Sequence, residues 1–166
     1  MTGAGSVSII DAEAEHVGRI SDLEAAAFGK ASWGADGVRE GVIGEANRAL
    51  LAFGPSVDEP ERGGLEADLP VGFAIWRLAA DEAEILTIGV IPEARRRGIA
   101  ACLLARIIQD AEIAGVVSMF LEVDAGNDGA IGLYEAAGFE PVGARARYYR
   151  SGADALIMQK DLNKRR

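Results

Sequence analysis

The segment from Ile85 to Ile107, ILTIGVIPEARRRGIAACLLARI, constrains the fold more than any other part of the chain. An apolar run ends at a proline, three arginines follow, and a glycine opens a second apolar run. The second run carries apolar residues at helical spacing, and Gly115 is placed to end it. This apolar stripe consists of Ile99, Leu103, Ile107 and Ala111, flanked by Leu104 and Ile108. The segment therefore predicts a strand that turns directly into an amphipathic helix.

Strand and helix patterns alternate along the rest of the chain. Strands are expected over residues 6–12, 48–54, 70–79, 82–91, 116–124, 144–150 and 154–162. Helices are expected over 14–28, 35–46, 98–115 and 128–138, the last capped by Asn127 or Asp128 and ended by Gly138. The order βααβββαβαββ predicts an α/β fold with a mixed central sheet of about seven strands flanked by about four helices.

Two segments carry more specific expectations. The nearly continuous apolar run at 116–124 predicts a strand buried on both faces. The stretch from Gly54 to Pro70 is rich in glycine, proline and acidic residues, which indicates a surface loop between two strands. Too few residues precede it for a separate domain, so a single domain over residues 1–166 is expected.

Composition and charge narrow the classes of partner. The net charge of −9 favours basic partners and repels nucleic acid outside local basic patches, and the basic tail NKRR is expected to be a solvated terminus. No apolar run approaches the roughly 20 residues that span a bilayer. The N-terminus lacks a basic segment followed by an apolar block, and Cys102 is the single cysteine. We therefore expect a cytoplasmic protein with no membrane partner and no direct contact with nucleic acid.

The turn with three arginines has the features of an anion site. A helix N-terminus offers unpaired N–H groups, and Gly98 lets the backbone approach a ligand closely. Ala100 and Ala101 keep the first helical turn free of bulk, and the preceding arginines add positive charge. The dinucleotide motif G-x-G-x-x-G and the Walker G-K-[ST] are both absent here. A solvated basic loop is the alternative interpretation.

Two further residues suggest proton chemistry. Glu122 lies within the apolar run MFLEV, where a carboxylate should be paired, protonated or functional. A general base is one interpretation, and a strand-end carboxylate paired with an arginine is the other. Tyr134 on the next helix is a candidate proton donor or, alternatively, a core aromatic residue.

The turn resembles the acetyl-CoA motif of the GNAT acetyltransferases, [QR]-x-x-G-x-[GA]. Arg95, Gly98 and Ala100 occupy its defined positions, and the resemblance extends from about Val71 to Leu162. It implies a GNAT fold and acetyl-CoA as cosubstrate. Backbone bonds to the pantetheine arm are implied for Ile88, Gly89 and Val90. A pyrophosphate cradle is implied for Arg95, Arg96, Arg97, Gly98, Ile99, Ala100 and Ala101.

Within that superfamily, FLEV…N…A…LYEAAGFEPVG resembles the ribosomal-protein N-terminal alanine acetyltransferases of the RimI type. This resemblance implies that Glu122 is the base, Tyr134 the acid and Asn127 a cofactor contact. ARYYRSGADALIMQKDL is similar to that family's last hairpin, whose paired tyrosines help to hold the substrate. Tyr148 and Tyr149 fall there, although aromatic residues also suit strands in general. Trp33 lies in a segment similar to the substrate-side helix.

The expected function is acetyl transfer from acetyl-CoA to the N-terminal α-amine of a protein, such as a basic ribosomal protein with N-terminal alanine. A GNAT enzyme for a lysine side chain, a polyamine or another small amine is an alternative. A non-catalytic acetyl-CoA-binding module is a second alternative. His16 is the single histidine, so triad chemistry is set aside, and no cluster suggests a metal. Cys102 is interpreted as a small packing residue.

Overall fold

A computed structural model describes residues 6–54 and 69–163. Most of the loop expected between Gly54 and Pro70 lies outside these residues, as does most of the basic tail. The described elements are β1 (Ser8–Ala12), α1 (Val17–Phe28), α2 (Gly34–Ile43), β2 (Asn47–Phe53), β3 (Pro70–Ala79), β4 (Glu82–Val90), α3 (Ile99–Ile113), β5 (Ser118–Asp124), α4 (Asp128–Ala136), β6 (Glu140–Arg145) and β7 (Ala155–Asp161). This order confirms the predicted α/β sequence of elements.

Seven strands among the described residues form one mixed sheet in the order β1-β2-β3-β4-β5-β7-β6. The chain divides into two compact units. The first, here called the N-terminal unit, comprises residues 1–75 and 87–103, and the second, the C-terminal unit, comprises 76–86 and 104–166. The prediction of a single domain is not tested by this division.

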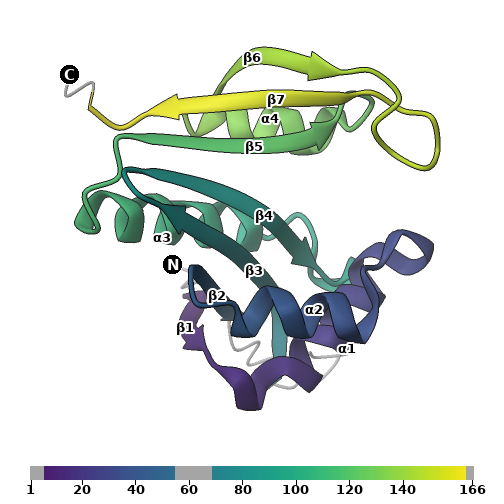
Figure 1. Ribbon diagram of the computed structural model, residues 1–166. Helices are drawn as coiled ribbons and strands as arrows, with labels where there is room; N and C mark the ends of the chain where they lie inside the picture. Colours follow the sequence, from purple (N-terminus) through teal and green to yellow (C-terminus); the bar gives the residue numbers. More distant parts are fainter. Residues whose placement is uncertain (1–5, 55–68, 164–166) are drawn as a thin grey trace, which may run out of the picture. The chain divides into compact units, whose positions relative to one another are not determined.

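In the N-terminal unit, β1 pairs antiparallel with β2, from Ser8 opposite Phe53 to Ala12 opposite Ala49. Helices α1 and α2 pack against each other, and the elements of this unit can be followed in Figure 1. The four central residues of β2 are all buried, as expected for an apolar strand inside a sheet. The largest fully buried side chains of this unit are Phe73, Ile20, Leu50, Leu51, Ile75, Ile99 and Leu103.

In the C-terminal unit, β5 is the central strand, and Figure 1 shows β7 and β6 following it in order. It pairs parallel with β4 from Glu82 opposite Ser118 to Ile85 opposite Leu121. It pairs antiparallel with β7 along its whole length. The largest fully buried side chains here are Phe139, Leu104, Ile107, Met119 and Leu121.

The expectation that 116–124 is buried on both faces is wrong. Met119, Leu121 and Val123 are buried, whereas the residues that alternate with them are only half-buried. Successive side chains of a strand point to opposite faces, so one face of β5 packs in the core and the other remains partly accessible. Glu122 belongs to the accessible face.

The predicted strand over 144–150 is also wrong in its position. β6 covers Glu140–Arg145, with an irregularity between Pro141 and Gly143, and the chain then leaves the sheet. Arg147 adopts a left-handed conformation with φ of 51°, and its N–H donates to Asp154 Oδ1 at 2.9 Å. This local turn overrides the β-propensity of the two tyrosines, which therefore lie in a loop.

The apolar stripe of α3 is confirmed, since Ile99, Leu103, Ile107 and Ala111 are all buried. Cys102 lies off this stripe and is exposed, so its interpretation as a packing residue is wrong. Within residues 6–54 and 69–163, no helix combines the length and the apolar character needed to cross a bilayer.

Candidate functional site

The turn between β4 and α3 belongs to the N-terminal unit and has an unusual backbone. After a short 3₁₀ turn at Pro92–Ala94, Arg96 has φ of 62° and Gly98 has φ of 76°. The Cys102 N–H then donates to the Gly98 carbonyl at 3.0 Å, which closes the first turn of the helix. Helix geometry leaves the preceding amides without partners inside the helix, and left-handed residues in such a turn direct N–H groups to one side. The backbone is therefore suited to bind an anion.

The three arginines of this turn have different surroundings. Arg95 donates from Nε to the Val90 carbonyl at 3.1 Å and from a terminal nitrogen to the Ala27 carbonyl at 2.8 Å. Its side chain thus ties the end of α1 to the end of β4. Arg96 and Arg97 are exposed, and their side chains form no hydrogen bond or ion pair with the described residues. The charge available to a ligand comes mainly from these two residues.

Gly89 has a packing reason to be glycine that the sequence did not reveal. A Cβ atom at this position would overlap Phe73 Cε1 and lie 3.2 Å from Phe28 Cε2. Phe73 is fully buried, so its ring has little room to move aside. Ile88 and Val90 on either side are half-buried. The rings of Phe73 and Phe28 therefore pack against the strand segment that is expected to line the pantetheine arm.

Glu122, in the C-terminal unit, directly follows Leu121, the last residue of β5 that pairs with β4. Its side chain is 20% exposed, and Arg145 Nε lies 2.9 Å from its Oε1. Both residues line a cavity of about 330 Å³. The ion pair matches the alternative interpretation of Glu122 made from sequence. Its position on a cavity wall leaves the carboxylate accessible to a ligand, so the interpretation as a base stays a prediction.

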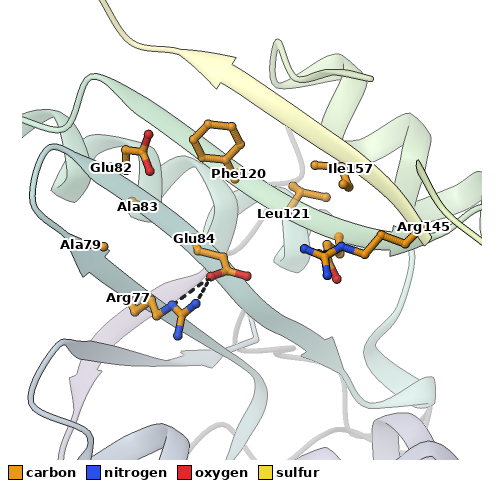
Figure 2. Close-up of a pocket in the computed structure, with 10 residues that line it drawn as sticks. Arg77, Ala79, Glu82, Ala83, Glu84, Phe120, Leu121, Arg145 and Ile157 are labelled. Atoms are coloured by element: carbon orange, nitrogen blue, oxygen red, sulfur yellow. Dashed lines mark hydrogen bonds and ion pairs between the residues drawn. The ribbon is translucent and has the colours of Figure 1, made fainter. Parts of the chain in front are cut away.

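This cavity lies on the accessible face of the C-terminal unit. Figure 2 shows Arg145 extending toward β5, beside Leu121 and Ile157. On β3 and β4, Arg77 Nε donates to Glu84 Oε2 at 2.9 Å, drawn as dashed lines. The cavity is lined by Arg77, Ala79, Glu82, Ala83, Glu84, Phe120, Leu121, Glu122, Arg145 and Ile157. An amine-bearing ligand fits this wall, which carries three carboxylates and two arginines.

Tyr148 and Tyr149 lie in the loop after β6 and not in a strand. A hydrogen bond to Glu122, together with the charge of that carboxylate, raises the pKa of the exposed Tyr148 phenol. The Arg145 guanidinium carbon lies 5.6 Å from the centre of the Tyr148 ring, a cation–π arrangement. The two tyrosine rings meet edge to face, with centroids 5.2 Å apart. The structure thus gathers both tyrosines with Glu122 and Arg145.

Tyr134 on α4 is a core aromatic residue in its packing. It is 9% exposed and meets Phe139 edge to face, with ring centroids 5.9 Å apart. Burial, with a smaller contribution from Tyr149, raises its pKa to about 12. The phenol therefore keeps its proton at neutral pH. Both interpretations made from sequence remain, because a buried phenol can pack and still donate.

Asn127 has a structural role in addition to the expected cofactor contact. Its Oδ1 accepts from the Ala130 N–H at 3.1 Å, and so caps α4 as the sequence predicts. Gly138 follows the helix with φ of 93°, also as predicted.

Trp33, in the N-terminal unit, is 44% exposed and directly precedes α2 as its N-cap residue. Its backbone N–H donates to Glu24 Oε1 at 2.6 Å, and the Ser32 hydroxyl donates to Glu24 Oε2. Glu24 is 1% exposed, so a buried carboxylate fixes the turn that presents Trp33. Sequence reasoning missed Glu24, although its position beside Leu23 on the buried face of an amphipathic helix was a usable signal.

Sequence reasoning also missed Arg145 and the pair of Arg77 with Glu84. The signal for the pair of Arg77 with Glu84 was available, because opposite charges on either side of a hairpin turn often face each other. Arg145 could not be found in this way, because the predicted strand over 144–150 began four residues too late and so gave the wrong register.

Comparison with known proteins places the chain in a family. The model of the acetyltransferase (GNAT) family matches residues 43–139. A curated [ribosomal protein bS18]-alanine N-acetyltransferase of Salmonella typhimurium is 42% identical over 94 residues, which is 55% of this chain and 64% of that protein. N-alpha-acetyltransferase RimI of Mycobacterium tuberculosis is 46% identical over 96 residues, 55% of this chain and 59% of the relative. These alignments thus span less than two thirds of the relatives.

A solved structure agrees over a longer range. The crystal structure of the ribosomal-protein-S18-alanine N-acetyltransferase from Escherichia coli has a TM-score of 0.82 and 27% identity, covering 97% of each chain. The NatC complex bound to Gag peptide and CoA has a TM-score of 0.78 at 19% identity over 95% of this chain and 99% of that one, which shows the fold alone. Since the family model matches more than half of the residues, the chain belongs to the acetyltransferase (GNAT) family.

Proposed function

We propose that this protein transfers the acetyl group of acetyl-CoA to the N-terminal α-amine of a protein, with N-terminal alanine as the preferred acceptor. The observation that carries this proposal is the placement of Glu122 on the wall of a cavity, in a GNAT chain similar to enzymes named for alanine N-acetylation. The acidic surface supports a basic acceptor such as a ribosomal protein, because complementary charge steers encounter.

Acetyl-CoA is proposed to bind at the β4–α3 turn. The amides from Arg95 to Ala101 would hold the pyrophosphate, and the exposed Arg96 and Arg97 would add charge. Backbone groups of Ile88, Gly89 and Val90 would hold the pantetheine arm, and an N–H near Val90 would stabilise the oxyanion. Asn127 would contribute a further cofactor contact.

In the proposed mechanism the amine attacks the thioester carbonyl directly. Glu122 removes the amine proton, either in contact or through a water molecule. A tetrahedral intermediate forms as the nitrogen–carbon bond is made, and its collapse expels the thiolate of coenzyme A. Trp33, Tyr148 and Tyr149 are proposed to hold the acceptor.

Tyr134 is proposed as the proton donor to the leaving thiolate. Its pKa of about 12 exceeds the value of about 8.5 typical of a thiol, so complete transfer to the sulfur is uphill. The phenol would therefore act chiefly by donating a hydrogen bond as negative charge develops on sulfur. The proton that reaches the product thiol can come from solvent after release.

A panel of acceptors tests the proposed function. Coenzyme A release is measured with a basic peptide bearing a free N-terminal alanine, with the same peptide N-blocked but carrying a free lysine, and with spermidine. Turnover on the free-alanine peptide alone is the expected result. Turnover on the lysine peptide or on spermidine instead would assign the activity to another class of amine. Binding of acetyl-CoA without coenzyme A release on any of the three acceptors would favour a non-catalytic module.

A further inference from the structure

We propose that Arg145 is a positioning residue that neutralises Glu122, so that the acceptor amine is held beside the base in its reactive, uncharged form. This inference rests on the proposed function, since it concerns the amine from which Glu122 takes a proton as the nitrogen attacks the thioester. The carrying observation is the 2.9 Å contact between Arg145 Nε and Glu122 Oε1 at the cavity wall. A carboxylate directed at a bound amine is normally expected to be free.

The pairing has a chemical consequence for the amine. An amine can attack a thioester only through its lone pair, so the ammonium form is unreactive. An unpaired carboxylate attracts the ammonium form and raises the pKa of the bound amine. A guanidinium on the same carboxylate opposes that attraction, because it repels a second cation. Arg145 therefore favours binding of the free amine over its protonated form.

The groups around Glu122 show that Arg145 is the residue that balances the charge of this carboxylate. The charged or titratable groups near Glu122 are Arg145 on β6, Tyr148 and Tyr149 in the next loop, Asp124 on β5, Glu82 and Glu84 on β4, and Arg77 on β3. β7 contributes the apolar Ile157 opposite Glu122. Arg77 is paired with Glu84, and the raised pKa of Tyr148 keeps that phenol neutral. Among the described residues, Arg145 is the cation whose ion pair reaches Glu122.

A purely structural role for Arg145 fits the observations less well. All residues of β6 are exposed, and the Arg145 side chain is itself 58% exposed. Exposed ion pairs contribute little to stability because water and salt screen them. The position of Arg145 is nevertheless held from two sides, by Glu122 and by the ring of Tyr148. Because Arg145 contributes little to stability but contacts the candidate base, an effect on the charge of Glu122 explains its position better than a structural role.

The dependence of kcat on pH tests this role, because kcat reports ionisations in the substrate complex. Wild type is compared with Arg145→Gln, which removes the charge, and with Arg145→Lys, which keeps it. The control is Arg150→Gln, which removes an exposed charge from the loop of Tyr148 and Tyr149. The acid-side pKa of kcat should rise by about one pH unit or less in Arg145→Gln, given the screening. Arg145→Lys and Arg150→Gln should follow wild type. Superimposable profiles for wild type and Arg145→Gln, or an equal shift in Arg150→Gln, would overturn the role.

A binding measurement separates this inference from the proposed function. The peptide carries a ¹³C-methyl N-terminal alanine, whose NMR shift reports protonation of the α-amine, and it is titrated while bound with coenzyme A. A higher amine pKa on Arg145→Gln than on wild type supports the role even where turnover is slow. Equal pKa values contradict it while leaving α-amine acetylation intact. A wild type that neither binds nor acetylates the peptide would overturn both.

Discussion

The β4–α3 turn of the N-terminal unit and the Glu122 cluster of the C-terminal unit show two ways of building a binding site. In the turn, the positive φ of Arg96 and Gly98 sets the direction of amide groups, and the most engaged arginine, Arg95, bonds to backbone carbonyls. In the cluster, Glu122, Arg145 and Tyr148 contact one another through their side chains. Backbone conformation therefore defines the first site, and side-chain identity defines the second.

If side-chain identity defines the cluster, the largest effect on catalysis should come from changing one of its side chains. Glu122→Gln should lower kcat by about 10²-fold or more, because the amide cannot accept the amine proton. Binding of acetyl-CoA, measured by calorimetry, should be unchanged. Glu82→Gln is a matched control, since it makes the same change on the wall of the same cavity. A Glu122→Gln enzyme with wild-type kcat would show that side-chain identity does not define this site.

Tyr134 provides a second test through the alkaline stability of the fold. Its pKa is about 10 when unfolded and about 12 when folded, so the unfolded chain loses this proton first. The stabilisation is complete below pH 10 and should fall by about 2–3 kcal/mol as the pH rises to about 12. Urea unfolding across this range should show a shallower decline for Tyr134→Phe than for wild type. Equal slopes would mean that the phenol is not buried as described.

In the turn, the sharpest test changes conformation and leaves charge alone. A Cβ at Gly98 meets no atom within 4 Å, yet φ of 76° strains any other residue. In Gly98→Ala the free turn should relax away from this φ, and restoring it on binding should cost about 1–2 kcal/mol. Acetyl-CoA binding should therefore weaken about tenfold, while kcat at saturation is kept. Gly132→Ala on α4, also without nearby atoms but at an ordinary φ, should leave binding unchanged. If the two variants bind acetyl-CoA equally, the backbone does not define this site.

A change at Arg96 should have the smallest effect. It should relieve backbone strain and remove one positive charge at the same time. Its φ of 62° is unfavourable for arginine, so Arg96→Gly should stabilise the fold by about 1 kcal/mol. A gain of this size corresponds to a rise in Tm of about 2–4 °C for a chain of this length. Acetyl-CoA affinity should fall by only a few-fold, because one exposed cation is lost. A lower Tm would show that the Arg96 side chain is needed by the fold.

The sequence predicted the order of elements because periodicity and glycine placement are local signals. The α3 stripe, the Asn127 cap and the turn at Gly138 all rest on contacts within a few residues of each other. The position of β6 was wrong because a left-handed Arg147 and its bond to Asp154 outweigh the strand preference of two tyrosines. The half-buried face of β5 was missed for a related reason, since its exposure depends on which distant elements pack against it.

The sequence revealed those candidate site residues whose signal is local, and it did not reveal those that depend on distant partners. Glu122 stood out because it interrupts an apolar run, and the turn stood out by its glycine and arginines. Arg145 and Glu24 act through partners 23 and 8 or 9 residues away, respectively, so no short motif contains both members of each contact. The packing that requires Gly89 likewise depends on Phe28 and Phe73, which belong to other elements.

The most direct test of the account places two amines in one acceptor. A basic peptide with a free N-terminal alanine and one internal lysine is incubated with acetyl-CoA and the wild-type protein, and tandem mass spectrometry locates the acetyl group. We expect the acetyl group on the α-nitrogen of alanine, with the reaction strongly slowed by Glu122→Gln. An acetyl group on the lysine ε-nitrogen, or equal acetylation by Glu122→Gln, would contradict the account.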